Sequence, residues 1–504
     1  MRERDPSLNS GSLWRSPAVW VVVAGISVAM HIGKLPPAVP ALREELQVSL
    51  VQAGFLLSMI QFAGMFLGLM VGLFADVMGL KRCMLTGLML LSLASALGAT
   101  SQTPATLLLT RFFEGLGVLL SIMPAPSLLK QLLRGERLAK MLGWWAAYMP
   151  IGAASALLAG PWVIDALGWA DWWLMLSCIT LMAFYMLYLK VPSGITSQAE
   201  GHISLRWGER LKMTLSSKGP WLIAFCFCLY SAQWISVIGF LPTITAEMGI
   251  SATSSGMITA LVAAANILGN VGSGFFLARS AKKVLATQAL EQHQAELRES
   301  LKQQAQVPQD GLQGGQDHVS FGASPSFRTS PFEPQPAERS VEVASHGADA
   351  ETGVAASASA STPFVQFMRF VLRPEGMSAR LLLLGYLTMA VGGALAFVQI
   401  NGVSLPAEWR FVSILLFSCV GGIVPGTLFS LAVKLSPSSE CVAITVGWMQ
   451  QFSSMGQFFG PPLVAWLAVW VGGWQWTWGV TAFMAMVGVL IALKVTLALM
   501  QEQR

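Results

Sequence analysis

The chain alternates long apolar runs with short polar stretches, a pattern that is typical of membrane-spanning helices. A bilayer core requires about 20 apolar residues per helix, and twelve runs approach or exceed that length. They cover residues 17–38, 51–75, 83–99, 106–129, 141–165 and 172–189, and then 219–241, 255–278, 379–400, 411–433, 441–470 and 476–498. The pattern predicts an all-α polytopic membrane protein with twelve transmembrane helices in two sets of six.

A charged turn separates the second and third apolar runs. Its distinctive residues are Gly72, Asp76, Gly79, Lys81 and Arg82. Charged side chains are costly in lipid, so the turn should lie at a water interface, and Gly79 allows the backbone to reverse there. The turn closely resembles the cytoplasmic loop between helices 2 and 3 of the major facilitator superfamily. The resemblance implies a transporter in which this turn takes part in gating.

The two sets of helices also resemble each other, which indicates an internal repeat. The matched pairs are Gly33 with Gly239, Pro36 with Pro242, Glu136 with Glu440, and Gly168-Trp169 with Gly473-Trp474. Two parallel repeats of six helices, with the solute site between them, form the architecture of major facilitator transporters.

The repeats and polar stretches divide the chain into six parts. They are a cytoplasmic tail (1–16), a first six-helix half (17–189), a cytoplasmic linker (190–218), helices 7 and 8 (219–278), a long and partly disordered cytoplasmic loop (279–378), and helices 9–12 with the C-terminal tail (379–504).

Composition agrees with a membrane protein and excludes several other classes. Of 504 residues, 54% are hydrophobic and only 11% are charged. Lys and Arg are concentrated in loops that lie on one side of the predicted helices, which places both termini in the cytoplasm and favours a bacterial inner membrane. The net charge of +5 needs no nucleic acid to explain it. No cofactor, metal cluster, phosphate-binding loop or catalytic set is recognisable, so we do not expect an enzyme.

Ionisable groups inside membrane helices are the strongest candidates for function, because each must be paired or must face a polar cavity. His31 and Lys34 share a face of helix 1 and could hold an anion; alternatively, Lys34 extends to the lipid headgroups. Arg111 and Glu114 share a face of helix 4, within a segment that resembles the Arg-x-x-x-Gly signature of the superfamily. They form either a structural ion pair or a proton-coupling pair in which Glu114 carries the proton.

Uncharged polar groups could complete a central cavity. By the resemblance, helices 1, 4, 7 and 10 line that cavity, which favours Tyr230 and Gln233 in helix 7. Tryptophans gather at the outer ends of helices 5, 6, 11 and 12, and we expect an interfacial belt rather than a binding site. They are Trp162, Trp169, Trp172, Trp173, Trp466, Trp470, Trp474 and Trp476.

The sequence therefore predicts a monomeric secondary transporter that works by alternating access. His31, Lys34 and Arg111 outweigh Glu114 in charge, which favours proton-coupled uptake of a small organic or inorganic anion. Few acidic membrane residues also make the chain similar to the cyanate and nitroimidazole permease group. The alternatives are a multidrug or metabolite exporter, and a non-transporting sensor that signals through the 279–378 loop.

The charged turn has predicted partners at the cytoplasmic ends of two other helices. If the family geometry holds, Asp76 approaches the start of helix 11, and Lys81 or Arg82 bridges it to Glu440. In the second half Arg279 stands where Asp76 would be expected, and could reach Glu136. We expect a paired but unequal latch on the cytoplasmic side.

Overall fold

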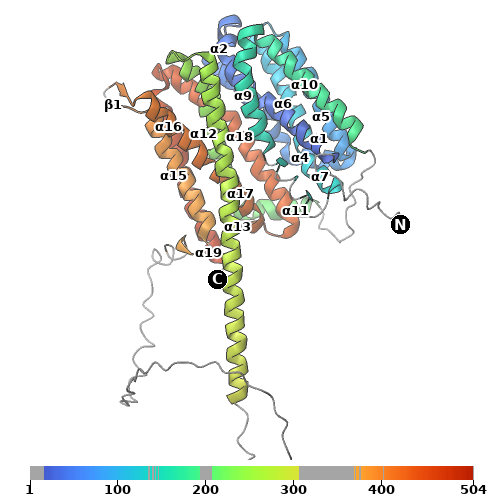
Figure 1. The fold of residues 1–504 in the computed structure, drawn as a ribbon, viewed down its shortest axis with the longest axis vertical. Helices are drawn as coiled ribbons and strands as arrows, with labels where there is room; N and C mark the ends of the chain where they lie inside the picture. The colour runs from blue at the N-terminus through green and yellow to red at the C-terminus, as the bar shows by residue number, and fades with distance from the viewer. Residues whose placement is uncertain are drawn as a thin grey trace, which may run out of the picture. The chain divides into compact units, whose positions relative to one another are not determined.

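A computed structural model describes residues 16–192, 207–305 and 368–502, apart from short gaps at 134–136, 139–140, 142–143, 146, 369–370, 374–375 and 401. Within these ranges the protein is almost entirely helical (Figure 1). The first-half helices are α1 (Ala18–Gly33), α2 (Leu35–Glu45), α3 (Leu50–Met59), α4 (Phe62–Met78), α5 (Leu80–Ala99), α6 (Pro104–Ile122), α7 (Ala125–Leu132), α9 (Tyr148–Leu167) and α10 (Trp169–Lys190).

The remaining elements begin with α11, which lies inside the predicted linker (190–218). They are α11 (Trp207–Ser216), α12 (Lys218–Glu247), α13 (Ala252–Ala305), α15 (Met377–Phe397), the strands β1 (Gln399–Ile400) and β2 (Val403–Ser404), α16 (Ala407–Gly421), α17 (Ile423–Lys434), η4 (Ser439–Cys441), α18 (Val442–Val471), η5 (Trp474–Trp476) and α19 (Thr477–Glu502). The two strands pair as a short antiparallel hairpin that the hydrophobic pattern did not predict.

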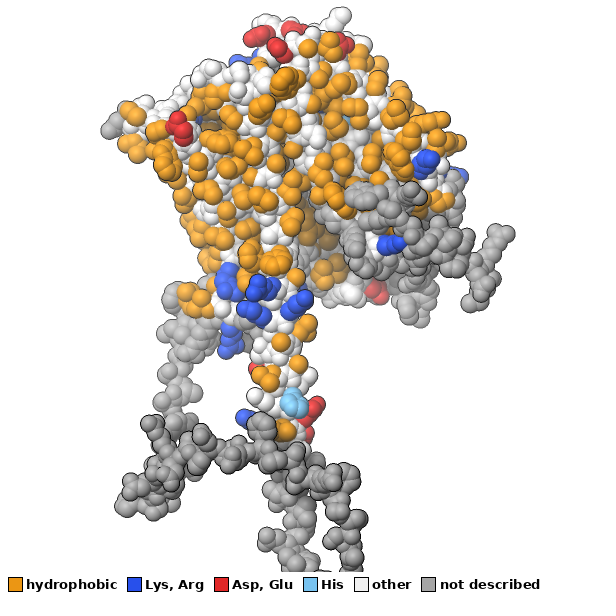
Figure 2. All heavy atoms as spheres, in the orientation of Figure 1, with side chains coloured by type: hydrophobic (Ala, Val, Ile, Leu, Met, Phe, Trp, Pro, Cys, Tyr) orange, Lys and Arg blue, Asp and Glu red, His pale blue; other side chains and the backbone are white. Residues whose placement is uncertain are grey.

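The described helices confirm a polytopic membrane protein. Eleven segments among the described residues are long and apolar enough to cross a bilayer. The 30-residue α18 occupies the place of the remaining predicted span, and it lies beside α12 in Figure 1. On the face drawn in Figure 2, hydrophobic side chains cover the middle of the helical bundle and acidic side chains gather at its upper end. An apolar belt of this kind suits a bilayer.

Several spans are interrupted by breaks. The first span breaks at Lys34, between α1 and α2, because Pro36 and Pro37 have no N–H to donate to the carbonyls of Ile32 and Gly33. The apolar pattern predicted one uninterrupted run over residues 17–38, whereas α2 continues beyond the break to Glu45. A helix break frees backbone carbonyls for side-chain donors.

The second span also breaks, between α3 and α4. At the end of α3, the Ile60 N–H bonds to the Ser58 carbonyl instead of the Leu56 carbonyl four residues earlier. The Leu56 carbonyl is therefore free to accept a donor from another helix. The start of α3 is regular, since Ser49 and Gln52 form a capping box.

The two halves meet along a seam in which α3 and α4 pack against α18. Small residues make this approach possible. A Cβ atom built on Gly54 would lie 2.9 Å from the Cα of Pro462. Farther along, Gln451 of α18 donates from Nε2 to the Met65 carbonyl of α4 at 2.7 Å. At one end of the bundle α2 also packs on α12.

Matched tryptophans make matched contacts in the two halves. Trp169 Nε1 donates to Glu45 Oε2 at 2.8 Å, and Trp474 Nε1 donates to Glu247 Oε2 at 3.0 Å. In each half, this contact joins the end of the first membrane span to the start of the last membrane span. The repeat seen in the sequence therefore extends to side-chain contacts.

The chain divides into two compact units. The first comprises residues 1–281 and 370–504 and holds the helical bundle, and the second comprises residues 282–369. In the second unit the described residues from 282 onward continue α13 to Ala305, and the side chains of residues 285–300 are exposed. Every site described below lies in the first unit.

A buried charge cluster in the membrane

Lys34 lies at the break between α1 and α2, and its ammonium group is at the centre of the candidate site. The side chain has no solvent exposure, which rules out its extension to the lipid headgroups. Its Nζ atom lies 2.6 Å from Glu114 Oε1 and 2.9 Å from Ser95 Oγ. The indole ring of Trp173 lies beneath it, with the ring centroid 4.4 Å away, at the distance of a cation–π contact. Lys34 therefore joins α5, α6 and α10.

Arg111 occupies the other side of the same carboxylate. Its Nη1 atom lies 2.6 Å from Glu114 Oε2, which confirms the contact expected from their spacing of three residues on α6. Nη1 also donates to the His31 carbonyl at 3.0 Å, and Nε donates to the Leu56 carbonyl at 3.3 Å. These carbonyls lie next to the breaks in the first two spans, so Arg111 holds both breaks against α6.

Each oxygen of the Glu114 carboxylate thus accepts from a different cation. Arg111 and Glu114 are both fully buried, as Lys34 is. The Nη2 atom of Arg111 has no hydrogen-bond partner in the described part of the chain. With all three groups ionised, the cluster carries one uncompensated positive charge in a water-poor interior, where charge is costly unless it is paired.

His31 extends this cluster toward α10. Its Nδ1 atom lies 3.3 Å from Lys34 Nζ, and its Nε2 atom lies 2.7 Å from Thr180 Oγ1. An ammonium group can only donate, so Nδ1 accepts from charged Lys34 and the ring proton lies on Nε2. His31 is therefore a neutral acceptor in this arrangement.

The structure brings four predicted site residues of the first half together. His31, Lys34, Arg111 and Glu114 form one continuous polar cluster. The pairing of Lys34 with Glu114 was not predicted, although a signal was present: Lys34 needed a carboxylate, and Glu114 was the acidic residue recognised within the apolar runs. The hydrogen bonds that these four residues form among the described residues all lie within the first half.

In the second half, uncharged polar groups form a buried network of their own. Tyr230 and Asn266 bond to each other, with Asn266 Nδ2 donating to Tyr230 Oη at 2.9 Å. Asn266 Nδ2 also donates to the Ser418 carbonyl at 2.8 Å, and Trp234 Nε1 donates to Ser418 Oγ at 3.1 Å. This network joins α12, α13 and α16.

Gln233 differs from these neighbours. It is fully buried on α12, yet neither its Oε1 nor its Nε2 has a hydrogen-bond partner among the described residues. A buried amide without partners costs free energy. Gln233 thus offers an unused donor and an unused acceptor one helical turn from Tyr230.

The tryptophan belt was predicted only partly correctly. Trp162, Trp466, Trp470 and Trp476 are half or more exposed and suit an interfacial belt. Trp172 and Trp173 are instead fully buried. Trp172 Nε1 donates to the Lys34 carbonyl at 3.2 Å, and Trp173 stacks on the Lys34 ammonium. Trp169 and Trp474 are buried as well. The prediction failed at these four positions because a dense cluster of tryptophans resembles a belt even when some of its members face the protein interior.

The charged turn between α4 and α5 is only partly described. Gly79 adopts a φ of +85°, so the expected left-handed turn is present. Lys81 Nζ donates to the carbonyls of Tyr188 and Val191, at 3.0 and 2.5 Å, which ties the turn to the end of α10. That tie to its own half was not predicted.

The remaining latch residues can be placed only in part. Gly72 and Asp76 fall within α4, but the Asp76 side chain and all of Glu136 lie outside the described residues. Arg82, Arg279 and Glu440 are exposed. The bridges from the turn to Glu440, and from Arg279 to Glu136, therefore stay predictions.

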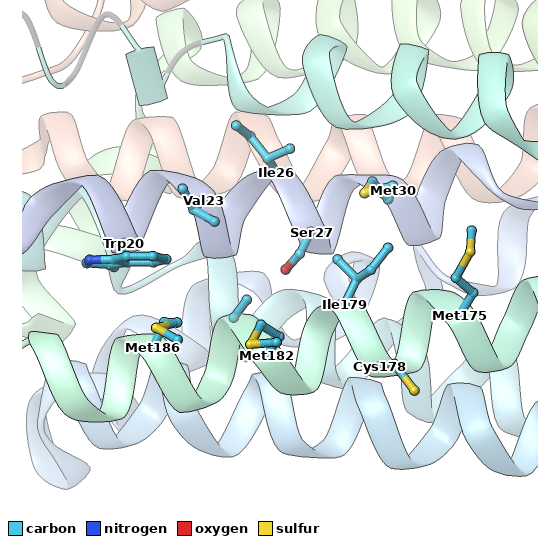
Figure 3. Close-up of a pocket in the computed structure, with 11 residues that line it drawn as sticks. Trp20, Val23, Ile26, Ser27, Met30, Met175, Cys178, Ile179, Met182 and Met186 are labelled. Atoms are coloured by element: carbon cyan, nitrogen blue, oxygen red, sulfur yellow. The ribbon is translucent and has the colours of Figure 1, made fainter. Parts of the chain in front are cut away.

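A separate groove of about 410 Å³ lies between α1 and α10 (Figure 3). Its lining is apolar and rich in methionine, including Met30, Met175, Met182 and Met186, and Ser27 supplies a hydroxyl. Lys34, Arg111 and Glu114 do not line it. We therefore do not assign the solute site to this groove.

Comparisons with known proteins agree with this architecture. A sequence model described as the Major Facilitator Superfamily matches residues 19–290. The chain is 25% identical over 267 residues to NiaP of Bacillus subtilis (strain 168), a candidate niacin/nicotinamide transporter. That alignment covers 51% of this chain and 64% of NiaP, so the chain spans somewhat less than two thirds of this relative.

Solved structures share the fold at low sequence identity. The nucleoside transporter NupG (D323A mutant) matches with a TM-score of 0.63 and 11% identity, over 95% of this chain and 99% of NupG. A bacterial homologue of the human lysosomal transporter Spinster, in an inward-facing and unoccupied conformation, matches with a TM-score of 0.61 and 12% identity, over 96% of this chain and 97% of its own.

The protein belongs to the Major Facilitator Superfamily. It is a multi-pass membrane protein.

Proposed function

We propose that this protein takes up a small organic anion together with protons, working by alternating access. In this proposal it is a monomer in the cell membrane, which for a bacterium is the inner membrane, and both termini face the cytoplasm. The family assignment implies transport of a small molecule. The proposal adds the class of solute.

The observation that carries the proposal is the buried charge excess around Glu114. Lys34 and Arg111 share one carboxylate, and burying an uncompensated cation is costly. An anionic solute that approached the cluster would offset this cost, whereas a cationic drug would add to it. Arg111 Nη2 supplies an unused donor for such an anion, and guanidinium groups suit carboxylates.

The second half suits the uncharged part of the solute. Gln233 provides an unused donor and acceptor, and Tyr230 provides an aromatic face and a hydroxyl. A small ring bearing a carboxylate would use both kinds of group. Niacin, named in the relative NiaP, ionises to such a molecule, so nicotinate is the first solute to test.

Alternating access requires the halves to rock about this site. In our proposal the turn at Gly72, Asp76, Gly79, Lys81 and Arg82, together with Glu136, Arg279 and Glu440, closes the cytoplasmic side. Gln451 and Met65 lie on the seam between the halves, and their hydrogen bond would have to change as the halves move.

The test is uptake of labelled nicotinate and, separately, of uncharged nicotinamide by proteoliposomes. We expect nicotinate to be taken up, and Lys34→Ala and Arg111→Ala to reduce its uptake by about 30-fold, which corresponds to about 2 kcal/mol. Lys494→Ala is the matched control, because Lys494 lies in membrane helix α19 but is exposed. Full uptake of every transported anion by both cluster variants would contradict the anion site.

The same preparation separates the alternatives. An exporter of lipophilic compounds would transport them without regard to Lys34, and deletion of its gene would sensitise cells to them. A sensor would bind solute without transport, and excision of the loop within residues 307–363 would abolish its output while leaving binding intact.

A further inference from the structure

We infer that Lys34, rather than Glu114, carries the coupling proton. The inference rests on the proposed proton coupling and assigns it to a different residue from the one that the sequence suggested. It follows from the contacts of the four ionisable groups in the cluster.

Arg111 is excluded by its chemistry and by its contacts. A guanidinium group stays protonated in proteins. Arg111 is also held by three acceptors: Glu114 Oε2 and the carbonyls of His31 and Leu56. Its role is to position the carboxylate and to hold the two helix breaks.

Glu114 is a poor proton carrier in this geometry. Both of its oxygens accept from cationic donors at 2.6 Å. A proton on either oxygen would weaken that oxygen as an acceptor for Lys34 Nζ or Arg111 Nη1. Protonation would also leave two buried cations without a counter-charge, which costs more than the present arrangement.

Lys34 is the group whose loss of charge would remove the excess positive charge of the cluster. It faces His31 on α1, Ser95 on α5, Arg111 and Glu114 on α6, and the Trp173 ring on α10. When one N–H bond of its ammonium breaks, the electron pair remains on nitrogen and the proton passes to water in the opened cavity. One cation and one anion then remain, so the buried cluster becomes neutral.

His31 is better suited to positioning than to carrying the proton. Its Nδ1 atom faces Lys34 Nζ, so a proton there would bring a third cation into contact with the other two. As an acceptor it orients the ammonium, and Thr180 fixes its ring.

This assignment explains how proton and anion could move together. Charged Lys34 leaves the cluster with a net positive charge, which attracts an anion. Loss of the proton to the cytoplasm makes the cluster neutral and weakens its hold on the anion. Proton and anion would therefore leave together, with no net charge moved per cycle.

The experiment follows the protonation of both groups in the purified full-length protein without any solute. Lysine side chains are labelled with ¹⁵N at Nζ, and the Lys34 signal is identified as the one missing from Lys34→Met. We expect this signal to change between ammonium and amine forms within the pH range in which the protein stays folded. Infrared difference spectra over the same range should show no protonated-carboxyl band that Glu114→Gln removes.

Opposite results would overturn the inference. A Lys34 signal that stays in the ammonium form, together with a carboxyl band that Glu114→Gln removes, would assign the proton to Glu114. If the pH-dependent change of the Lys34 signal disappears in His31→Gln, His31 is the titrating group. Since no solute is present, failure of nicotinate uptake would contradict the proposed function while leaving these measurements valid.

Discussion

The ammonium nitrogen of Lys34 lies 2.6 Å from a carboxylate oxygen of Glu114, although 80 residues separate them in the sequence. Both side chains are fully buried. Arg111 holds the second oxygen of the same carboxylate at 2.6 Å. A carboxylate shared by two cations predicts that the members of this cluster respond differently to substitution.

Glu114→Gln should destabilise the protein more than Lys34→Met. The first change leaves Lys34 and Arg111 as buried cations without a counter-charge, a loss of about 3–5 kcal/mol. The second leaves Arg111 and Glu114 as a one-to-one pair. Thermal unfolding of both variants in detergent, with Glu408→Gln as an exposed control on α16, measures the difference. Equal loss of stability in both variants would contradict the cluster.

Arg111→Lys should fail to replace arginine even though it keeps the charge. A lysine cannot reach Glu114 and the carbonyls of both helix breaks at once, because it lacks the planar fork of donors. We expect a loss of about 1–3 kcal/mol in stability and impaired transport, whereas Arg43→Lys, at an exposed position, should behave like the wild type. A fully stable Arg111→Lys would show that the two carbonyl contacts contribute nothing.

Gly54→Ala should disturb the seam between the halves. The added methyl group would lie 2.9 Å from the Cα of Pro462, and backbone atoms cannot move aside as a flexible side chain can. Overpacking of this kind costs about 1–3 kcal/mol. Gly274→Ala is the control, since a methyl group there meets nothing within 4 Å. Indistinguishable melting and transport in the two variants would rule out a tight seam at Gly54.

Gln451→Leu should alter the equilibrium between conformations, because it removes the hydrogen bond from α18 to the Met65 carbonyl across the seam. The measurement is the labelling rate of a single cysteine placed near the cytoplasmic end of the seam. Gln457→Leu is the matched control, since Gln457 bonds to Ser453 on its own helix. A labelling rate unchanged in Gln451→Leu would mean that this bond does not bias the conformation.

Much of the fold could be predicted because each apolar run must satisfy its own backbone in lipid. Repeat partners such as Trp169 and Trp474 make equivalent contacts. Within one helix, the spacing of Arg111 and Glu114 also predicted their contact. Contacts between distant helices were harder to predict, because periodicity shows which face a residue lies on but not which helix that face meets.

The course of the first span and the environment of Trp173 illustrate that difficulty. The apolar pattern predicted a single run over residues 17–38, yet the structure breaks it at Lys34 and continues as α2. The break puts Lys34 where Glu114, Ser95 and Trp173 converge. Trp173 was assigned to the lipid interface because its burial depends on α5 and α6, which the local pattern does not place.

The most direct test of the central claim is nicotinate accumulation in proteoliposomes under an imposed proton gradient. We predict uphill accumulation when the outside is acidic, its loss when an ionophore dissipates the gradient, and its absence in Lys34→Met but not in Lys494→Met. Accumulation that does not depend on the proton gradient, or that persists unchanged in Lys34→Met, would contradict the account.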